Sequence, residues 1–158
     1  MTETAQSQWA PYEGLMPFES LAKLIDVPKS YLREAIRVIL PSVTLAKDGP
    51  VLKSVHLVTD SYLCEVRCIP APVEFDVARL ASIVNYRIRI ETREITQEDA
   101  GAPTEGGTER HATKREYDMA TVTLAHAYPF ATELTYVGEG RDAWLNNVLT
   151  AIPIAALH

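Results

Sequence analysis

No apolar run in this sequence is long enough to cross a membrane. A spanning helix needs about 18 or more consecutive apolar residues, and no stretch reaches that length. The first eight residues, Met1–Gln8, are polar and lack the basic start and apolar centre of a secretory signal peptide. The sequence therefore predicts a cytoplasmic protein, for which binding to a membrane is disfavoured.

Cysteine is scarce, with only Cys64 and Cys68 in the chain. Four residues of strand separate their Cα atoms by about 13 Å, whereas a disulfide needs them within about 7 Å. The two thiols therefore cannot pair if this segment is a strand, which agrees with a reduced compartment. No histidine lies near them in the sequence, so we expect buried structural thiols rather than zinc ligands.

An excess of positive charge is also missing. The chain has 15 Lys and Arg against 21 Asp and Glu, a net charge of -6. Such a surface repels phosphates and anionic headgroups on average. Nucleic acid is therefore a disfavoured partner, although a local basic patch remains compatible with these totals.

Signatures of catalysis or metal binding are absent as well. His56, His126 and His158 are scattered without metal-ligand spacing. Ser61 and Ser82 lack the glycine-flanked pattern of a nucleophile elbow, and no paired carboxylates suggest acid–base chemistry. We therefore expect no catalytic residue, no metal, no cofactor and no enzyme activity.

The N-terminal residues 1–14 read as a loose, flexible tail. Trp9 and Tyr12, together with Phe18 further on, are apolar anchors that could dock on a protein partner. Packing of Trp9 and Tyr12 on the protein's own surface is the favoured alternative. The short apolar spacing of Phe18–Leu24 then predicts a first helix.

A second helix is predicted to begin at Asp26, which can cap it, with Pro28 in the first turn. Apolar residues recur at helical spacing and Pro41 ends the pattern. Residues 15–41 are therefore expected to form an N-terminal helical segment. The apolar positions of this second helix are Leu32, Ala35, Ile36 and Ile39.

Residues 21–37 resemble a helix-turn-helix. Ala22 would be the small residue of the first helix, and Asp26 would stand at the turn. A helix pair that packs on a sheet explains the same residues, and the acidic net charge favours that reading. In the DNA-binding alternative the major groove would be contacted by Lys29, Ser30, Arg33 and Arg37.

Period-two alternation and turn residues predict antiparallel strands in the rest of the chain. The polar segment Thr96–Glu116, with its glycines and proline, is expected to be a flexible loop. The expected strands are Val51–Val58, Tyr62–Ile69, Tyr86–Ile95, 117–126 and 130–137.

One face of the strand Tyr86–Ile95 is strongly charged. Ile88 and Ile90 point one way, while Arg87, Arg89 and Arg93 point the other. These arginines are candidate contacts for a partner or a phosphate group. The interleaved Glu91 and Glu94 favour a solvated face whose charges pair with one another.

The chain is predicted to close with an amphipathic helix that begins near Arg141 and ends at Pro153. Its apolar stripe consists of Trp144, Leu145, Val148 and Ile152.

Three segments resemble the pleckstrin-homology (PH) superfold, and within it the GRAM and bacterial PH-like domains. They are Leu57–Cys64, a strand and turn followed by an aromatic-Leu-Cys strand, the run Phe75–Ile83, and the closing helix with Trp144 and Leu145. The resemblance covers residues 43–152, with 153–158 as a tail. It implies an α+β domain, a bent antiparallel sheet forming a barrel or sandwich, capped by the C-terminal helix.

The resemblance also implies a non-enzymatic module. Some such domains bind phosphoinositides and many bind proteins. Lipid-binding members place several basic residues around the first hairpin, where this chain has only Lys53 and Arg67, beside Asp60 and Glu65. A cytoplasmic adaptor or scaffold that binds a protein, with a homo-oligomer as one form, is therefore the favoured function. DNA binding and lipid-headgroup binding are the alternatives.

Overall fold

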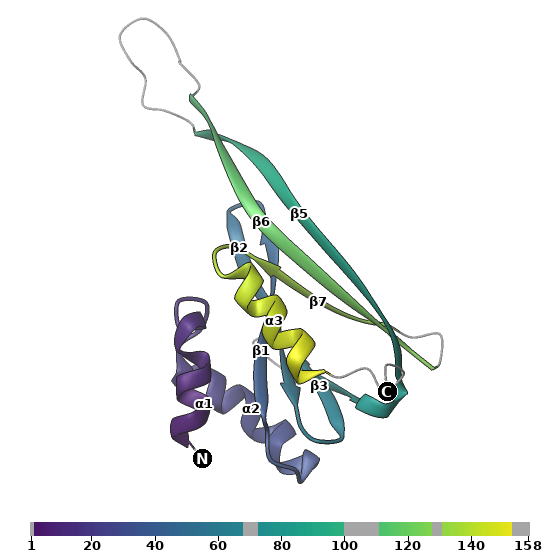
Figure 1. Ribbon diagram of the computed structural model, residues 1–158. Helices are drawn as coiled ribbons and strands as arrows, with labels where there is room; N and C mark the ends of the chain where they lie inside the picture. The colour runs from purple at the N-terminus through teal and green to yellow at the C-terminus, as the bar shows by residue number, and fades with distance from the viewer. Residues whose placement is uncertain (1, 68–72, 100–110, 128–130, 153–158) are drawn as a thin grey trace, which may run out of the picture.

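The computed structural model describes residues 2–67, 73–99, 111–127 and 131–152. Within them the chain forms three α-helices, two short 3-10 turns and seven strands (Figure 1). The predicted α+β class is therefore confirmed. Cys68 and the predicted tail 153–158, which includes His158, lie outside the described residues.

The strands form two antiparallel sheets. Four make the first sheet in the order β1-β2-β3-β4, and three make the second in the order β5-β6-β7. Strands β1 and β2 meet at a tight turn where Gly49 has a φ of 123°, which an L side chain rarely adopts. The bounds are β1 Val38–Ala46, β2 Gly49–Val58, β3 Tyr62–Arg67, β4 Phe75–Arg79, β5 Ile83–Asp99, β6 His111–His126 and β7 Ala131–Val137.

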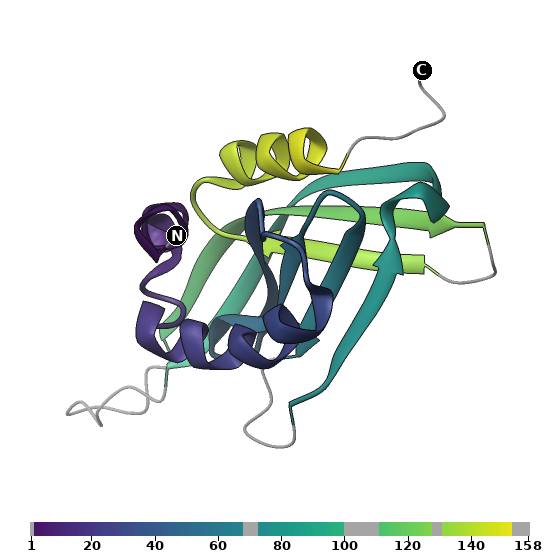
Figure 2. The same ribbon diagram turned by 90° about the horizontal axis from the view of Figure 1, so that it is seen from below.

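The two sheets approach each other where β7 lies beside β1. There the Thr135 backbone N–H donates to Ser42 Oγ at 3.1 Å. No ladder joins the sheets among the described residues, so the strands form two stacked sheets and not a closed barrel. In Figure 2 the strands lie between helix α3, Arg141–Ala151, and helix α2, Phe18–Leu32.

The C-terminal helix is confirmed. Its buried residues Trp144 and Val148 come from the predicted stripe, and Ile152 is buried directly after it. The indole N–H of Trp144 donates to the Pro41 carbonyl at 2.9 Å, and the ring stacks on Tyr136. Helix α3 is thereby held to β1 of the first sheet and β7 of the second.

The prediction of a loose N-terminal tail is wrong. Residues Thr2–Trp9 form helix α1, and Ala10–Tyr12 continue as a 3-10 turn. Trp9 is fully buried, and its indole N–H donates to the Met16 carbonyl at 2.8 Å. The helix has a polar sequence, so its formation depends on this one aromatic anchor more than on an apolar stripe.

The helix-turn-helix geometry is also wrong. Helix α2 runs without a turn through Asp26 and Pro28, and it ends where Arg33 adopts the left-handed conformation at φ 57°. A helix interior tolerates proline only if one backbone hydrogen bond is given up. That loss is compensated here by burial of Pro28 in the apolar face of α2, which is formed by Leu21, Ile25, Pro28 and Leu32.

The predicted second helix is helical only up to Leu32, and its predicted continuation through Ile39 is wrong. Residues Val38–Ala46 form β1, and Pro41 lies inside it opposite Val55. Strand β1 is at the edge of its sheet, where a residue without an N–H is tolerated. The expected boundary at residues 41–43 is therefore displaced, because the first sheet begins at Val38.

The predicted loop Thr96–Glu116 is strand at both of its described ends, residues 96–99 and 111–116. Strand β5 continues to Asp99 and β6 begins at His111, and they pair through Asp99↔His111. Strand β7 pairs with β6 only from Met119 to Ala125. The outer halves of β5 and β6 therefore project beyond the sheet as a two-stranded ribbon (Figure 1).

A single hydrophobic core contains residues from all three helices and both sheets. Fully buried examples are Trp9, Leu21, Leu57, Leu124 and Trp144. Helices α1 and α2 therefore share their core with the sheets.

Candidate functional site

Strand β5 is the longest edge of the protein. It contains 17 residues, which span about 55 Å in extended conformation. The sheet order places it outermost, so it pairs with β6 on one side and with no described strand on the other. An edge strand presents unpaired backbone N–H and C=O groups that can accept another strand.

The structure brings the three predicted arginines together on one face of β5. Arg87, Arg89 and Arg93 alternate along the strand with side chains largely exposed to solvent. Glu91 lies between them and pairs with Arg89 at 3.4 Å and Arg93 at 3.2 Å. Arg87 forms no ion pair with any residue that the structure describes. The predicted pairing within this face is thus confirmed for two of the three arginines.

These arginines border a hollow of about 790 Å³ that the strands of the second sheet line together with Thr44 of β1. The register places Thr123 opposite Arg87 and Thr121 opposite Arg89. The neighbouring strand β7 adds Thr135 and Glu133. The hollow therefore offers guanidinium and hydroxyl groups on a rigid sheet, which suits hydrogen bonding to an acidic group.

The opposite face of β5 exposes apolar side chains. Ile88 and Ile90 are 43% and 55% exposed, although their cross-strand partners Val122 and Ala120 are fully buried. On this face of the sheet the side chains of the central strand β6 are thus shielded from solvent, while those of the edge strand β5 are not. Two neighbouring exposed isoleucines on an edge that no described strand covers are typical of an interaction surface.

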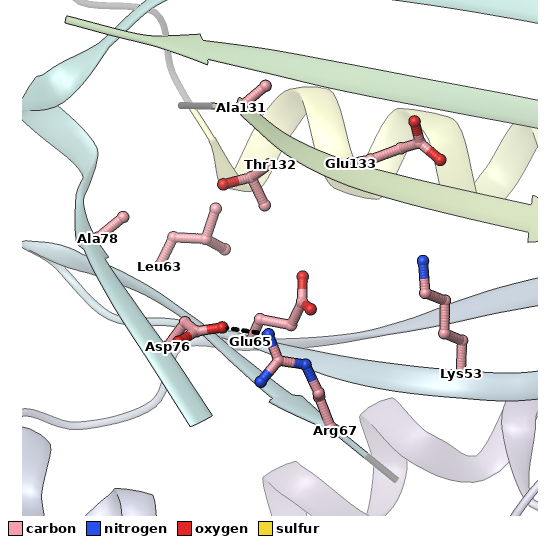
Figure 3. Close-up of a pocket in the computed structure, with 9 residues that line it drawn as sticks. All are labelled: Lys53, Leu63, Glu65, Arg67, Asp76, Ala78, Ala131, Thr132 and Glu133. Carbon is pink, nitrogen blue, oxygen red and sulfur yellow. Dashed lines mark hydrogen bonds and ion pairs between the residues drawn. The ribbon is translucent and has the colours of Figure 1, made fainter. Parts of the chain in front are cut away.

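A second hollow, of about 240 Å³, lies between the first sheet and β7 (Figure 3). The Arg67 guanidinium is held by Asp76 at 2.7 Å and by Glu74 at 3.2 Å. The side chains of Lys53 and Glu65 point toward β7. The remaining charges of this hollow are only partly paired, and it presents no group poised for chemistry.

Glu65 in this hollow forms a hydrogen bond with a buried histidine. Its carboxylate lies 3.0 Å from His56 Nε2, and this hydrogen bond is the main cause of a lowered pKa for Glu65. His56 is fully buried, and its Nδ1 has no hydrogen-bond partner within the described part of the chain. The pair stabilises the packing between β2 and β3.

A serine and a histidine also meet, at the end of the second sheet. Ser82 Oγ lies 2.7 Å from His126 Nδ1 and donates its single hydrogen to the Arg79 carbonyl. The histidine therefore donates to the serine, and its Nε2 accepts from the Thr132 hydroxyl at 2.8 Å. A histidine that donates to a serine cannot act as the base that activates it. This arrangement is a structural hydrogen-bond chain.

Burial lowers the pKa of His126 below its ordinary value of 6.5. The unfolded chain therefore takes up a proton first as pH falls, and the free energy of unfolding should decrease below about pH 6.5. We expect this decrease between about pH 8 and about pH 5 in urea unfolding of the wild type, and a smaller one in His126→Asn. A decrease of equal size in the variant would assign the pH dependence to other groups.

Two of the predicted partner anchors are inside the molecule. Trp9 and Tyr12 are buried, which confirms the alternative in which they pack on the protein's own body. The prediction that these two residues are exposed anchors for a partner is therefore wrong. Phe18, at the start of α2, is half-buried against the core.

The four residues of the DNA-binding alternative do not share one helix. Lys29 and Ser30 lie in the last turn of α2, and Arg33 follows its end. Arg37 precedes β1, where its side chain pairs with Asp60 at 3.1 Å and donates to the Thr59 carbonyl. No recognition helix therefore presents these side chains together.

The remaining candidate chemistry is equally limited. Cys64 is buried, as predicted for a structural thiol, and burial raises its pKa to about 12, so it is not a nucleophilic thiolate. Among the described residues no three metal-ligating side chains cluster. In the same part of the chain no helix is long and apolar enough to span a bilayer.

Comparison of the chain with known protein families, curated proteins and solved structures finds no significant match. The arguments about function therefore depend on the geometry of this molecule.

Proposed function

We propose that this protein is a non-enzymatic, PH-like interaction module that binds a protein partner by adding a strand at the edge of β5. The observation that carries the proposal is the exposure of Ile88 and Ile90 on a long edge strand. Backbone groups of such an edge provide affinity, and alternate side chains provide specificity.

The PH-like assignment is supported by the order of the elements. Four antiparallel strands form one sheet, the next three form another, and a helix with a buried tryptophan follows them. The resemblance implies antiparallel strands in a barrel or sandwich followed by a capping helix, and this order agrees with it, with α1 and α2 added in front.

The proposal predicts that Ile88→Lys with Ile90→Lys abolishes capture of a stoichiometric partner from nuclease-treated extract of the native host. Two added lysines leave the fold intact because both positions are exposed, but they cannot be buried beneath an added strand. The measurement is quantitative mass spectrometry of the captured proteins, with thermal unfolding to verify the fold of each variant.

The matched control is Val27→Lys with Tyr31→Lys. These residues are 42% and 72% exposed, and both lie on α2. The control should capture the partner as the wild type does. Equal capture by all three proteins would place the interface elsewhere. Recovery of nucleic acid instead of protein in a parallel capture without nuclease would favour the DNA-binding alternative.

A further inference from the structure

The two faces of the β5 edge have opposite chemistry, and together they define what an added strand must carry. We infer, on the basis of the proposed function, that the partner strand has acidic and apolar side chains at alternate positions. An added strand continues the pleat of the sheet, so its side chains lie alternately on the arginine face and on the isoleucine face.

The arginine face selects acidic side chains. Between Arg87 and Arg93 it carries three arginines and a single glutamate, in a protein whose net charge is -6. Arg87 has no described ion-pair partner, and Arg89 and Arg93 share the one carboxylate of Glu91. A carboxylate on a neighbouring strand would lie directly beside these guanidinium groups.

The other acidic residue in the same hollow does not neutralise this edge. Glu133 lies on β7, which is separated from β5 by β6. Adjacent strands are about 4.8 Å apart, so β7 is about twice that distance from β5. A strand added on the free side of β5 therefore meets the arginines first.

The isoleucine face selects apolar side chains. Ile88 and Ile90 are separated by one residue, so two alternate side chains of the added strand would cover both. Apolar residues are therefore needed at every second position of the added strand, and acidic residues are needed at the positions between them. The pattern sought is therefore acidic-apolar alternation over about five residues.

A second copy of β5 fits this edge poorly. Two such strands would bring three arginines and one glutamate against three arginines and one glutamate. Like charges directly opposite each other destabilise a strand pair. A partner with the opposite charge satisfies the edge better than self-association does.

The test uses the full-length protein and three labelled synthetic peptides of equal length. The first alternates Glu and Val, the second alternates Lys and Val, and the third has the composition of the first without alternation. We expect the Glu-Val peptide to bind at least about tenfold more tightly than the other two by fluorescence polarisation. Its affinity should fall as salt is raised.

Arg87→Glu with Arg89→Glu should lower the affinity for the Glu-Val peptide by about tenfold and raise the affinity for the Lys-Val peptide. The control, Lys23→Glu with Lys29→Glu on α2, makes the same change in net charge at exposed positions far from β5 in the sequence. It should change either affinity less than about twofold.

The outcomes separate this inference from the proposed function. If both alternating peptides bind equally and Ile88→Lys with Ile90→Lys abolishes both, strand addition stands and the acidic class is overturned. If no peptide binds while host-partner capture still depends on the two isoleucines, the acidic-apolar class is again overturned. If arginine-dependent binding is found only for DNA or anionic vesicles, the ligand of this edge is a polyanion and not a peptide strand, and the inference is overturned.

Discussion

Trp144→Ala is expected to lower the free energy of unfolding by about 3–5 kcal/mol, a typical loss when a large buried aromatic is truncated. Trp144 is fully buried, its ring stacks on Tyr136 with centroids 5.4 Å apart, and its N–H donates to the Pro41 carbonyl. The substitution removes the contact that holds α3 to both sheets. Urea unfolding followed by circular dichroism measures the effect.

Trp144→Phe is the control for this change. It keeps a ring beside Tyr136 but leaves the Pro41 carbonyl without its donor, so we expect a smaller loss of about 1–3 kcal/mol. A loss below about 1 kcal/mol in Trp144→Ala would contradict the packing of α3 described above.

Trp9→Ala should have an effect of similar size, about 3–5 kcal/mol. The Trp9 ring lies 5.4 Å from Tyr12, which contacts Tyr136 edge-on at 6.2 Å, and Tyr136 stacks on Trp144. This row of four rings joins the N-terminal helix to the C-terminal one. Thermal and urea unfolding would measure the loss, and hydrogen exchange would show reduced protection of amides in α1.

Gln8→Ala is the matched control in the same helix. The Gln8 side chain is half-buried and donates to the Arg37 carbonyl at 2.9 Å in a solvent-exposed hydrogen bond, so its removal should cost about 1 kcal/mol or less. An equally small effect of Trp9→Ala would restore the prediction of a loose tail.

The C-terminal helix illustrates what can be predicted locally. Trp144, Leu145, Val148 and Ile152 recur at spacings of three and four residues between Gly140 and Pro153. A helix places both spacings on one side, whereas a strand would put residues three apart on opposite faces. The strands were predicted for the same reason, because their alternation has a period of two.

The region of residues 32–41 illustrates where local reasoning fails. The apolar run Val38-Ile39-Leu40 fits either a helix or a strand, since periodicity cannot separate them over so few residues. Pro41 was interpreted as a helix stop, but it is accommodated in β1 because that strand is an edge. Helix α2 continues through Pro28 because the core side accepts the ring.

The loop prediction for Thr96–Asp99 was wrong for a different reason. A two-stranded ribbon outside the core needs no apolar face, because its ladder consists of backbone hydrogen bonds. The polar composition of residues 96–116 therefore indicated a loop where the structure has paired strands at both ends.

By itself the sequence determined the α+β class, the closing helix and the grouping of Arg87, Arg89 and Arg93 on one face, because each depends on periodicity within a single element. Only the tertiary structure decided that Trp9 is buried, that β5 is an edge, and that Ile88 and Ile90 are exposed on it. Burial and edge position depend on which elements pack beside a residue. Those neighbours come from distant parts of the chain, so no local pattern encodes them.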